Sequence, residues 1–209
     1  MRDPVALVAA RCHLRAAMTD ITLIRPSLDW LPAYEDALAR GWSPNTDHDV
    51  SREQLRQLRR NPERFLHDLY NSPMIRLADG REVARLPAHD FWISDGAFCG
   101  RIGFRFQRGT EELPPTAYGH IGYTIVPWKQ RRGYATQALR MILPVCREEG
   151  FSRVLITCDD DNEASRKVIL ANGGVPDGTV PHKARPGHVK LQFWVPTDAG
   201  ADTTVSLAG

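Results

Sequence analysis

The sequence predicts one domain of the α/β or α+β class, in which a mixed central sheet carries helices on both faces. Segments with a strand pattern alternate with segments with a helical pattern, as in layered folds. The 209 residues suffice for one substantial core, and no internal repeat or linker divides them. With 42% hydrophobic and 25% charged residues, the composition is that of a soluble globule. We expect the domain over 21–196, a loose extension over 1–20 and a disordered tail over 197–209.

The first half of the chain is expected to contribute one strand and a group of helices. An apolar run predicts a strand over 21–28, and apolar residues at helical spacing predict a helix over 30–41. The same spacing recurs over 51–71, where Pro62 should either divide the segment into two helices or kink it. The stretch 73–87 has turn residues and no clear period, so we expect a loop there.

The second half alternates strands and helices. The run 153–158 is almost continuously apolar, which predicts a central strand buried on both faces. The stretch between the last helix and the last strand is rich in proline and glycine, and we expect turns in it. The expected elements are a hairpin over 91–94 and 98–106, strands over 120–126, 153–158 and 189–195, and helices over 133–150 and 159–172.

Charge and cysteine usage limit the classes of function. The formal net charge of +2 is too small to suggest a nucleic-acid or membrane surface, so we expect neither partner. The four cysteines are scattered without metal-ligand spacing, which favours free thiols, a reducing cytoplasmic setting and no metal. The apolar stretch near the N-terminus is cut by Arg11 and is too short for a secretory segment or membrane span, although a transit segment stays an alternative.

The segment "QRRGYA", Gln130 to Ala135, joins a predicted strand to a predicted helix. A helix N-terminus exposes unpaired N–H groups and attracts anions, and the small residues Gly133 and Ala135 would let an anion approach them. Arg131 and Arg132 add positive charge. The alternative is that Gly133 serves only a turn and the arginines are solvated. The sequence contains no GxxxxGK[ST], and no GxGxxG follows a strand, which argues against P-loop and dinucleotide-binding sites.

The same segment resembles the coenzyme A motif of the GNAT acyltransferase superfamily, whose pattern is Gln/Arg-x-x-Gly-x-Gly/Ala. A second GNAT signature, Asn-x-x-Ser at the start of the next helix, is met by Asn162 and Ser165. Each motif lies at its expected junction between strand and helix, and the resemblance covers roughly residues 90–195. Two motifs at the expected separation are more specific than either alone. The chain is therefore identified as a member of this superfamily.

The resemblance implies a GNAT-like domain with a splayed strand pair, here 120–126 and 153–158, that holds the pantetheine arm of acetyl-CoA. Asn162 would bond the pantetheine amide, with Ser165 in the same motif; the alternative, suggested by residue type, is that Asn162 only caps its helix. The strand would offer main-chain bonds to pantetheine from Thr124, Ile125 and Val126. The pyrophosphate would rest on the segment made of Gln130, Arg131, Arg132, Gly133, Tyr134, Ala135 and Thr136.

The resemblance also implies an activity. The expected function is an N-acetyltransferase that moves an acetyl group from acetyl-CoA, without a metal, to a primary amine by direct transfer in a ternary complex. The acceptor would be a small-molecule amine or a peptide amine, and a homodimer is an expected state. An alternative from another class is a catalytically silent acyl-CoA sensor, which would bind acetyl-CoA without releasing CoA in the presence of amines.

Two residues are candidates for acid–base chemistry. His120, at the start of the motif strand, is the candidate base because its ordinary pKa lies near neutrality; the alternative is a half-exposed polar residue. Many GNAT enzymes carry a tyrosine seven residues after the helix asparagine, where this chain has Ile169. Tyr123 is therefore the candidate acid. The alternatives are Tyr134, water, a thiolate that leaves unaided, or the absence of catalysis.

Several charged residues bear on the acceptor. Asp159, Asp160 and Asp161 would either attract a cationic amine or complement the dipole of the following helix. Other charged residues fall in regions that border the acceptor site in this superfamily, where they would favour an anionic acceptor or simply be solvated. They are Arg105, His182, Lys183 and Arg185.

Overall fold

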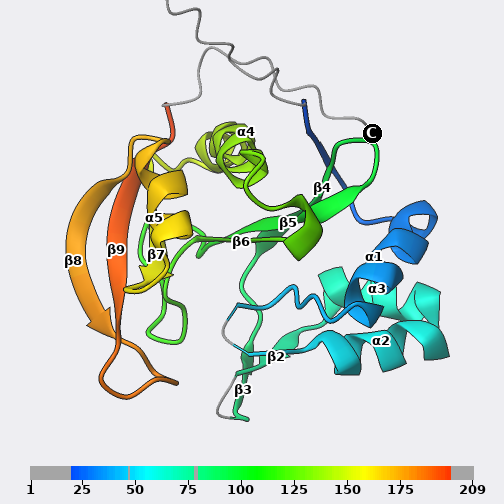
Figure 1. The fold of residues 1–209 in the computed structure, drawn as a ribbon. Coiled ribbons are helices and arrows are strands. Elements are labelled where there is room, and N and C mark those ends of the chain that lie inside the picture. Colours follow the sequence, from blue (N-terminus) through cyan, green and yellow to red (C-terminus); the bar gives the residue numbers. More distant parts are fainter. Residues whose placement is uncertain (1–19, 47, 78–79, 199–209) are drawn as a thin grey trace, which may run out of the picture.

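A four-stranded antiparallel sheet forms the centre of the protein (Figure 1). The structure, a computed structural model, describes residues 20–198 apart from 47 and 78–79. The sheet consists of β1 (Thr22–Ile24), β4 (Ala88–Ser94), β5 (Phe98–Arg105) and β6 (Ile121–Ile125). Their order is β1-β4-β5-β6, so β6 is an edge strand of this sheet.

A second antiparallel sheet lies next to β6 (Figure 1). It consists of β7 (Arg153–Asp159), β8 (Val175–Pro181) and β9 (Val189–Pro196). The order β7-β9-β8 makes β7 the edge strand that faces β6. A separate short hairpin is formed by β2 (Met74–Arg76) and β3 (Glu82–Ala84).

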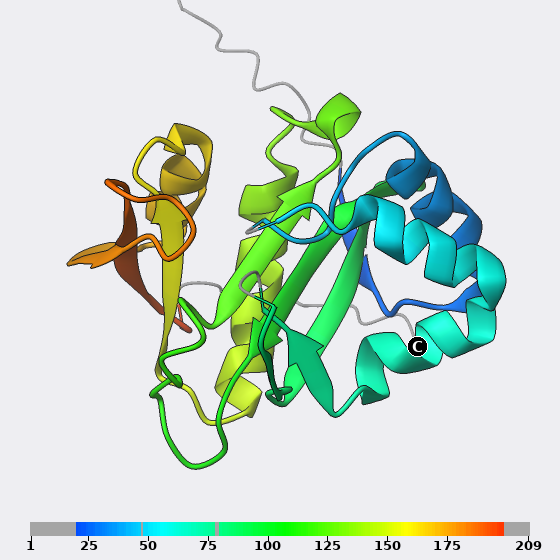
Figure 2. The same cartoon turned by 90° about the horizontal axis from the view of Figure 1, so that it is seen from below.

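Helices cover both faces of the four-stranded sheet (Figures 1 and 2). They are α1 (Leu31–Ala39), α2 (Ser51–Arg60), α3 (Pro62–Asn71), α4 (Tyr134–Glu148) and α5 (Glu163–Leu170), with 3₁₀ turns at Leu28–Trp30 and Pro127–Lys129. The first three helices gather on one face, and α4 lies on the other. As expected, Pro62 starts a new helix, and the Asn61 side chain caps it by accepting the Arg64 N–H at 2.7 Å.

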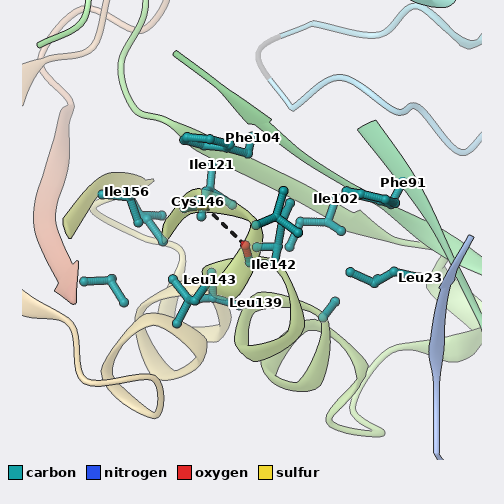
Figure 3. Packing of buried hydrophobic residues seen from close by; sticks show 14 of the residues in the cluster. Leu23, Phe91, Ile102, Phe104, Ile121, Leu139, Ile142, Leu143, Cys146 and Ile156 are labelled. Carbon is teal, nitrogen blue, oxygen red and sulfur yellow. Dashed lines mark hydrogen bonds between the residues drawn. The ribbon is translucent and has the colours of Figure 1, made fainter. Parts of the chain in front are cut away.

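Apolar side chains bury each face of the four-stranded sheet. On one face, Tyr34 of α1 stacks on Trp92 of β4 with ring centroids 4.7 Å apart. On the other, side chains of α4 pack against β5 and β6 and reach Ile156 of β7 (Figure 3). Burying this apolar surface on both faces supplies the main driving force for the layered fold. The residues labelled on the α4 side include Ile102, Phe104, Ile121, Leu139, Ile142, Leu143 and Cys146.

The predicted α/β (α+β) class is confirmed, but the expected mixed central sheet is wholly antiparallel, and several elements differ from the expectation. The expected loop over 73–87 contains β2 and β3, and the expected turns before β9 contain β8. The strand pattern of β8 was hidden by Pro176 and Gly178, which an edge strand with an irregular register tolerates. The run 153–158 forms β7, but its side chains alternate between buried and partly or fully exposed, and it lies at a sheet edge rather than at the centre.

The described residues run from Asp20 to Asp198, so the expected end segments fall almost wholly outside them. The expected extension over 1–20 lies outside the described residues except for Asp20, and the tail is described only as far as Asp198. Thr197, expected to be the first residue of the tail, is buried, and its Oγ1 donates to Phe151 O at 2.8 Å. The folded part therefore includes Thr197.

Candidate active site

The edges of the two sheets approach each other at one point, next to His120. The His120 N–H donates to Leu155 O at 2.7 Å, and the Leu155 N–H donates to His120 Nδ1 at 2.9 Å. The neighbouring Gly119 permits this contact, since a Cβ there would lie 3.0 Å from Leu155 O. Beyond this point β6 and β7 belong to different sheets. The edges of β6 and β7 therefore face each other, and hydrogen bonds between His120 and Leu155 join them at one end.

Some main-chain N–H and C=O groups of β6 point towards β5, and the others point towards the open edge of the sheet, which faces β7. The Val126 N–H donates to Cys99 O at 2.9 Å, and His120 O accepts the Arg105 N–H at 2.8 Å. Because peptide groups alternate along a strand, Thr124 also faces β5, whereas Tyr123 and Ile125 face the open edge. Of the three residues expected to offer main-chain bonds to pantetheine, only Ile125 faces the open edge, because the Val126 N–H is bonded to Cys99 O and Thr124 faces β5.

The segment between β6 and α4 presents an exposed helix N-terminus. Gly133 precedes α4 in a left-handed conformation with φ 79°, and Arg131 has φ 61°. The earliest helical bond runs from Gln137 N–H to Gly133 O at 3.0 Å. Within the described part of the chain, no side chain caps α4, so the N–H groups that precede Gln137 point out of the helix end without a cap. Gly133 is exposed, as both arginines of the motif are.

This segment is held in place from both sides by Asp95, in the turn between β4 and β5. Asp95 accepts hydrogen bonds from Lys129 Nζ at 2.7 Å and from Tyr134 Oη at 2.6 Å. Lys129 directly precedes the motif, and Tyr134 follows Gly133 within it. Burial opposes ionisation of Asp95, but these bonds outweigh it and hold the pKa of the carboxyl well below its usual range. Gln130 Nε2 also donates to Ile125 O at 3.3 Å, which ties the motif back to β6.

Tyr123 links β6 to α5. Its hydroxyl lies 2.8 Å from Ser165 Oγ, and burial raises the pKa of the phenol well above its ordinary value, against a smaller opposing effect of the Ser165 bond. Asn162 Oδ1 accepts the Ser165 N–H at 3.0 Å, so Asn162 is the N-cap of α5. Ile169, at the position where many relatives carry tyrosine, is fully buried in the core.

His120 is buried among aromatic rings, with only 1% of its surface exposed. Burial lowers the pKa of His120 to about 4. Since Nδ1 accepts the Leu155 N–H, the proton of the neutral ring lies on Nε2, which is buried and has no hydrogen-bond partner among the described residues. This environment favours a structural role for His120.

A cavity of about 480 Å³ opens on the face of the sheet opposite α4. Its floor comes from β5 and β6, and its walls come from the loop after α1, the β2–β3 hairpin, β4 and the segments before β6 and between β8 and β9. His48 lines it, and the buried Nδ1 of that ring has no hydrogen-bond partner within the described ranges. Arg105, His182 and Lys183, expected near the acceptor, line it too, whereas Arg185 does not.

Arg185 belongs instead to a set of ion pairs with the acidic segment before α5. Its Nη2 lies 2.7 Å from Asp161 Oδ2, and Asp159 Oδ1 lies 2.8 Å from Lys190 Nζ. His188 Nδ1 lies 3.1 Å from Asp160 Oδ1. The three aspartates thus have cationic or histidine partners, which does not favour the idea that they attract a cationic amine.

Metal, thiol and membrane features are limited in the described part of the chain. Asp160, Asp161 and His188 form the one described group with metal-ligand spacing, but it is largely exposed and shares its carboxylates with Arg185 and with its own histidine. The described cysteines, all buried, are free; Cys12 lies outside the described residues. No described helix has both the length and the apolar character needed to cross a membrane.

An exposed helix N-terminus suits a phosphate group, and an open strand edge beside it suits an extended ligand that carries amide groups. Residues 34–175 match the family model of the acetyltransferase (GNAT) domain. The chain therefore belongs to the GNAT family and is an acetyl-CoA-dependent acetyltransferase.

Solved structures share the fold at low sequence identity. One is the microcin C7 self-immunity acetyltransferase MccE in complex with acetyl-CoA and AMP, with 17% identity, a TM-score of 0.56 and coverage of 85% of this chain and 92% of that one. Another is the Salmonella typhimurium acetyltransferase that modifies the N-terminal serine of ribosomal protein L7/L12, with 17% identity, a TM-score of 0.55 and coverage of 84% and 94%. A spermidine N-acetyltransferase SpeG chimera from Vibrio cholerae and hSSAT has 11% identity, a TM-score of 0.55 and coverage of 88% and 99%. Curated protein sequences give no significant match.

Sequence reasoning missed most of the cavity lining. His48, Arg85 and Arg101 all line the cavity, and they lie in three segments that are distant in sequence. The one local signal was the pair Arg101 and Gly103, which a strand pattern places on one face with Arg105. The identity of the facing segments became clear only from the fold.

Proposed function

We propose that the protein transfers the acetyl group of acetyl-CoA to a primary amine, directly and in a ternary complex. The observation that carries this proposal is the exposed, uncapped start of α4 beside the open edge of β6. Main-chain N–H groups there suit a pyrophosphate, and an unpaired strand edge suits the amide groups of pantetheine. The acceptor would enter from the opposite side, through the cavity over Gly103 and Gly122.

The residues assigned to acetyl-CoA follow from this arrangement. Of the strand residues, Ile125 contributes main-chain groups together with Tyr123, and Thr124 lies between them with a buried Oγ1. Asn162 uses Oδ1 as a cap, so a pantetheine carbonyl would be bound through its Nδ2. The pyrophosphate would contact Gln130, Arg131, Arg132, Gly133, Tyr134, Ala135 and Thr136, with Ser165 closer to the thioester.

In the reaction, the acceptor nitrogen attacks the thioester carbonyl carbon, and the carbon–sulfur bond breaks. The proton that the amine loses is ultimately matched by the proton that the thiolate gains, so an amide and a thiol result. Because the pKa of Tyr123 is raised above that of an ordinary thiol, Tyr123 keeps its proton and stabilises the departing thiolate as a hydrogen-bond donor.

For the amine proton, His48 is a better placed acceptor than His120. His48 lines the cavity, whereas His120 does not line it and its Nδ1 already accepts the Leu155 N–H. A matched pair of variants tests this choice. We expect His48→Gln to lower kcat about tenfold or more and to change the pH–rate profile, because general acid–base catalysis contributes about 10²–10⁴. A changed profile in His120→Gln alone would assign the proton to His120.

The experiment that tests the function combines calorimetry with acetyl-CoA and a CoA-release assay over a panel of small and peptide amines. We expect binding together with release of CoA that depends on the amine. Tight binding without release for any amine would favour the acyl-CoA sensor instead. The free buried thiols are compatible with a cytoplasmic enzyme, and a homodimer stays a prediction that light scattering would test.

A further inference from the structure

We propose that the acceptor amine carries an anionic group, a carboxylate or a phosphate, and that arginines of the cavity bind this group. That the acceptor is an amine rests on the proposed acetyl transfer. That it carries an anionic group rests only on the residues that line the cavity. The anionic end would lie among Arg85, Arg101 and Arg105, and the amine end would lie over Gly122, where the cavity reaches β6.

The described residues that line the cavity are strongly unbalanced in charge. Asp90 is the one carboxylate among them. Three of the cationic side chains are only partly exposed, and in a partly desolvated site the attraction of an anion is stronger than in water. The cations are Arg76, Arg81, Arg85, Arg101, Arg105 and Lys183.

Asp90 neutralises only part of this charge, because two arginines share it. Arg85 Nη2 lies 3.3 Å from Asp90 Oδ2, and Arg101 Nη2 contacts Asp90 Oδ1. The side chains of Arg85 and Arg101 are 23% and 28% exposed, so neither is freely solvated. Asp90 thereby fixes two guanidinium groups at the cavity wall and leaves one positive charge. Planar guanidinium groups held in this way suit bidentate bonds to a carboxylate or phosphate.

The cavity floor is formed by two glycines, of which the Asp90–Arg101 pair covers Gly103 and leaves Gly122 uncovered. Gly103 and Gly122 lie opposite each other in the β5–β6 pair, and both line the cavity. A Cβ at Gly103 would lie 2.4 Å from Asp90 Oδ1 and 2.7 Å from Arg101 Nη2, so only glycine leaves room for the ion pair. Arg105 lies beyond the second glycine, with Nη2 4.0 Å from the position of a Cβ at Gly122. A ligand can therefore reach the floor at Gly122, with Arg101 over the neighbouring Gly103 and Arg105 on the other side.

The cationic cavity is separate from the segment assigned to the phosphates of acetyl-CoA. No described residue between Pro127 and Thr136 lines it. It also lies on the sheet face that carries Arg101 and Gly103, whereas Ile102 and α4 occupy the other face. The positive charge of the cavity is therefore available to the acceptor rather than to the acetyl donor.

Matched acceptors test the proposal with the full-length protein and acetyl-CoA. The pairs are O-phosphoethanolamine with ethanolamine, β-alanine with its amide, and a peptide with two aspartates after its N-terminal residue with the corresponding asparagine peptide. We expect kcat/KM for CoA release, corrected for the fraction of neutral amine, to be at least tenfold higher for the anionic member. This preference should shrink as salt is raised, since ionic strength screens the interaction.

Two arginine variants and one control identify the groups responsible. Arg101→Gln and Arg105→Gln should each reduce the ratio of kcat/KM for the anionic acceptor to kcat/KM for its neutral partner at least fivefold, and leave the acetyl-CoA affinity unchanged. Retained acetyl-CoA affinity also shows that the variants are folded. The control is Arg140→Gln, an exposed arginine on α4, which should change nothing.

The outcomes separate this inference from the proposed function. Equal or lower kcat/KM for the anionic members would overturn the inference and leave acetyl transfer intact. If no amine releases CoA, calorimetry with O-phosphoethanolamine on the CoA-saturated protein decides. Binding that is lost in Arg101→Gln and absent for ethanolamine supports the anion site even though the acetyl-transfer proposal fails. Absence of binding as well would overturn the inference.

Discussion

The proposed donor side and the proposed acceptor side of this enzyme offer different chemical groups to their ligands. On the donor side, the start of α4 and the edge of β6 offer main-chain groups, and the key residue Gly133 has no side chain at all. On the acceptor side, the cavity is lined by long charged side chains such as Arg85 and Arg101. The donor side thus fits one invariant ligand, whereas the acceptor side can be changed by substituting side chains without altering the fold.

The largest expected effect tests the donor side directly. We expect Gly133→Glu to weaken acetyl-CoA binding at least a hundredfold, about 2.7 kcal/mol, because a carboxylate would lie where the phosphates bind. Isothermal calorimetry measures it. The matched control is Gly150→Glu at the other end of α4, where the glycine has a similar φ of 90° and open space around it. Equal loss of acetyl-CoA affinity in both variants would contradict the assignment of the phosphate-binding site to Gly133.

The second prediction concerns the closed end of the parted strands. We expect His120→Phe to lower the free energy of unfolding at pH 7 by about 2 kcal/mol, because the Leu155 N–H loses its acceptor. The native pKa of His120 is about 4 and the ordinary value is 6.5, so the unfolded state binds more protons at low pH. This stabilisation is present above pH 6.5 and is lost as the pH falls towards 4, by an amount on the order of 3 kcal/mol.

Denaturant titrations at several pH values measure this effect. His120→Phe should lose the corresponding part of the pH dependence, whereas His67→Phe, at an exposed position on α3, should keep it. An unchanged pH dependence in His120→Phe would show that other groups cause the loss of stability in acid.

The acceptor side should respond to a single methyl group. We expect Gly103→Ala to raise the KM of the acceptor about tenfold, about 1.4 kcal/mol, and to leave acetyl-CoA affinity unchanged, because its Cβ would displace the pair of Asp90 and Arg101. Gly122→Ala adds the same methyl group across the strand pair without a close contact. A similar rise in KM for both would indicate that filling the floor, rather than moving the ion pair, is responsible.

The smallest expected effect separates catalysis from binding within the donor side. We expect Tyr123→Phe to lower kcat about fivefold, about 1 kcal/mol, without changing acetyl-CoA affinity, because it removes a hydroxyl near Ser165. Tyr134→Phe removes the bond to Asp95 instead and should weaken acetyl-CoA binding a few-fold. Steady-state kinetics measures the effect on kcat, and calorimetry measures the effect on acetyl-CoA affinity. A lower affinity in Tyr123→Phe and a lower kcat in Tyr134→Phe would assign the catalytic role to Tyr134 and the binding role to Tyr123.

The same difference explains which parts of the site the sequence could predict. Main-chain recognition requires small residues at fixed positions, so the segment from Gln130 to Ala135 is visible as a motif. The cavity assembles His48, Arg85 and Arg101 from distant segments, each of which looks like an ordinary surface residue in the sequence. Their proximity depends on how the strands pair, and single-sequence periodicity does not report pairing.

The fold was predictable where elements bury a continuous apolar face. The helix α4 shows its period clearly and packs against β5 as expected. The strand β8 is largely exposed and contains two prolines, so it has no apolar alternation to detect. His120 is a similar case at the level of one residue, because its burial depends on Phe104 and Phe151, which lie elsewhere in the chain.

The facing edges of β6 and β7 have a consequence for the protein without acetyl-CoA. Unpaired strand edges are sites where other chains can pair and aggregate. A bound pantetheine arm would lie between the edges of β6 and β7 and cover their unpaired main-chain groups. Acetyl-CoA would then stabilise the folded protein as well as react. A ligand at a hundred times its Kd stabilises a folded protein by about 2.7 kcal/mol. The concentration of acetyl-CoA should therefore affect the stability of the folded enzyme as well as its rate of turnover.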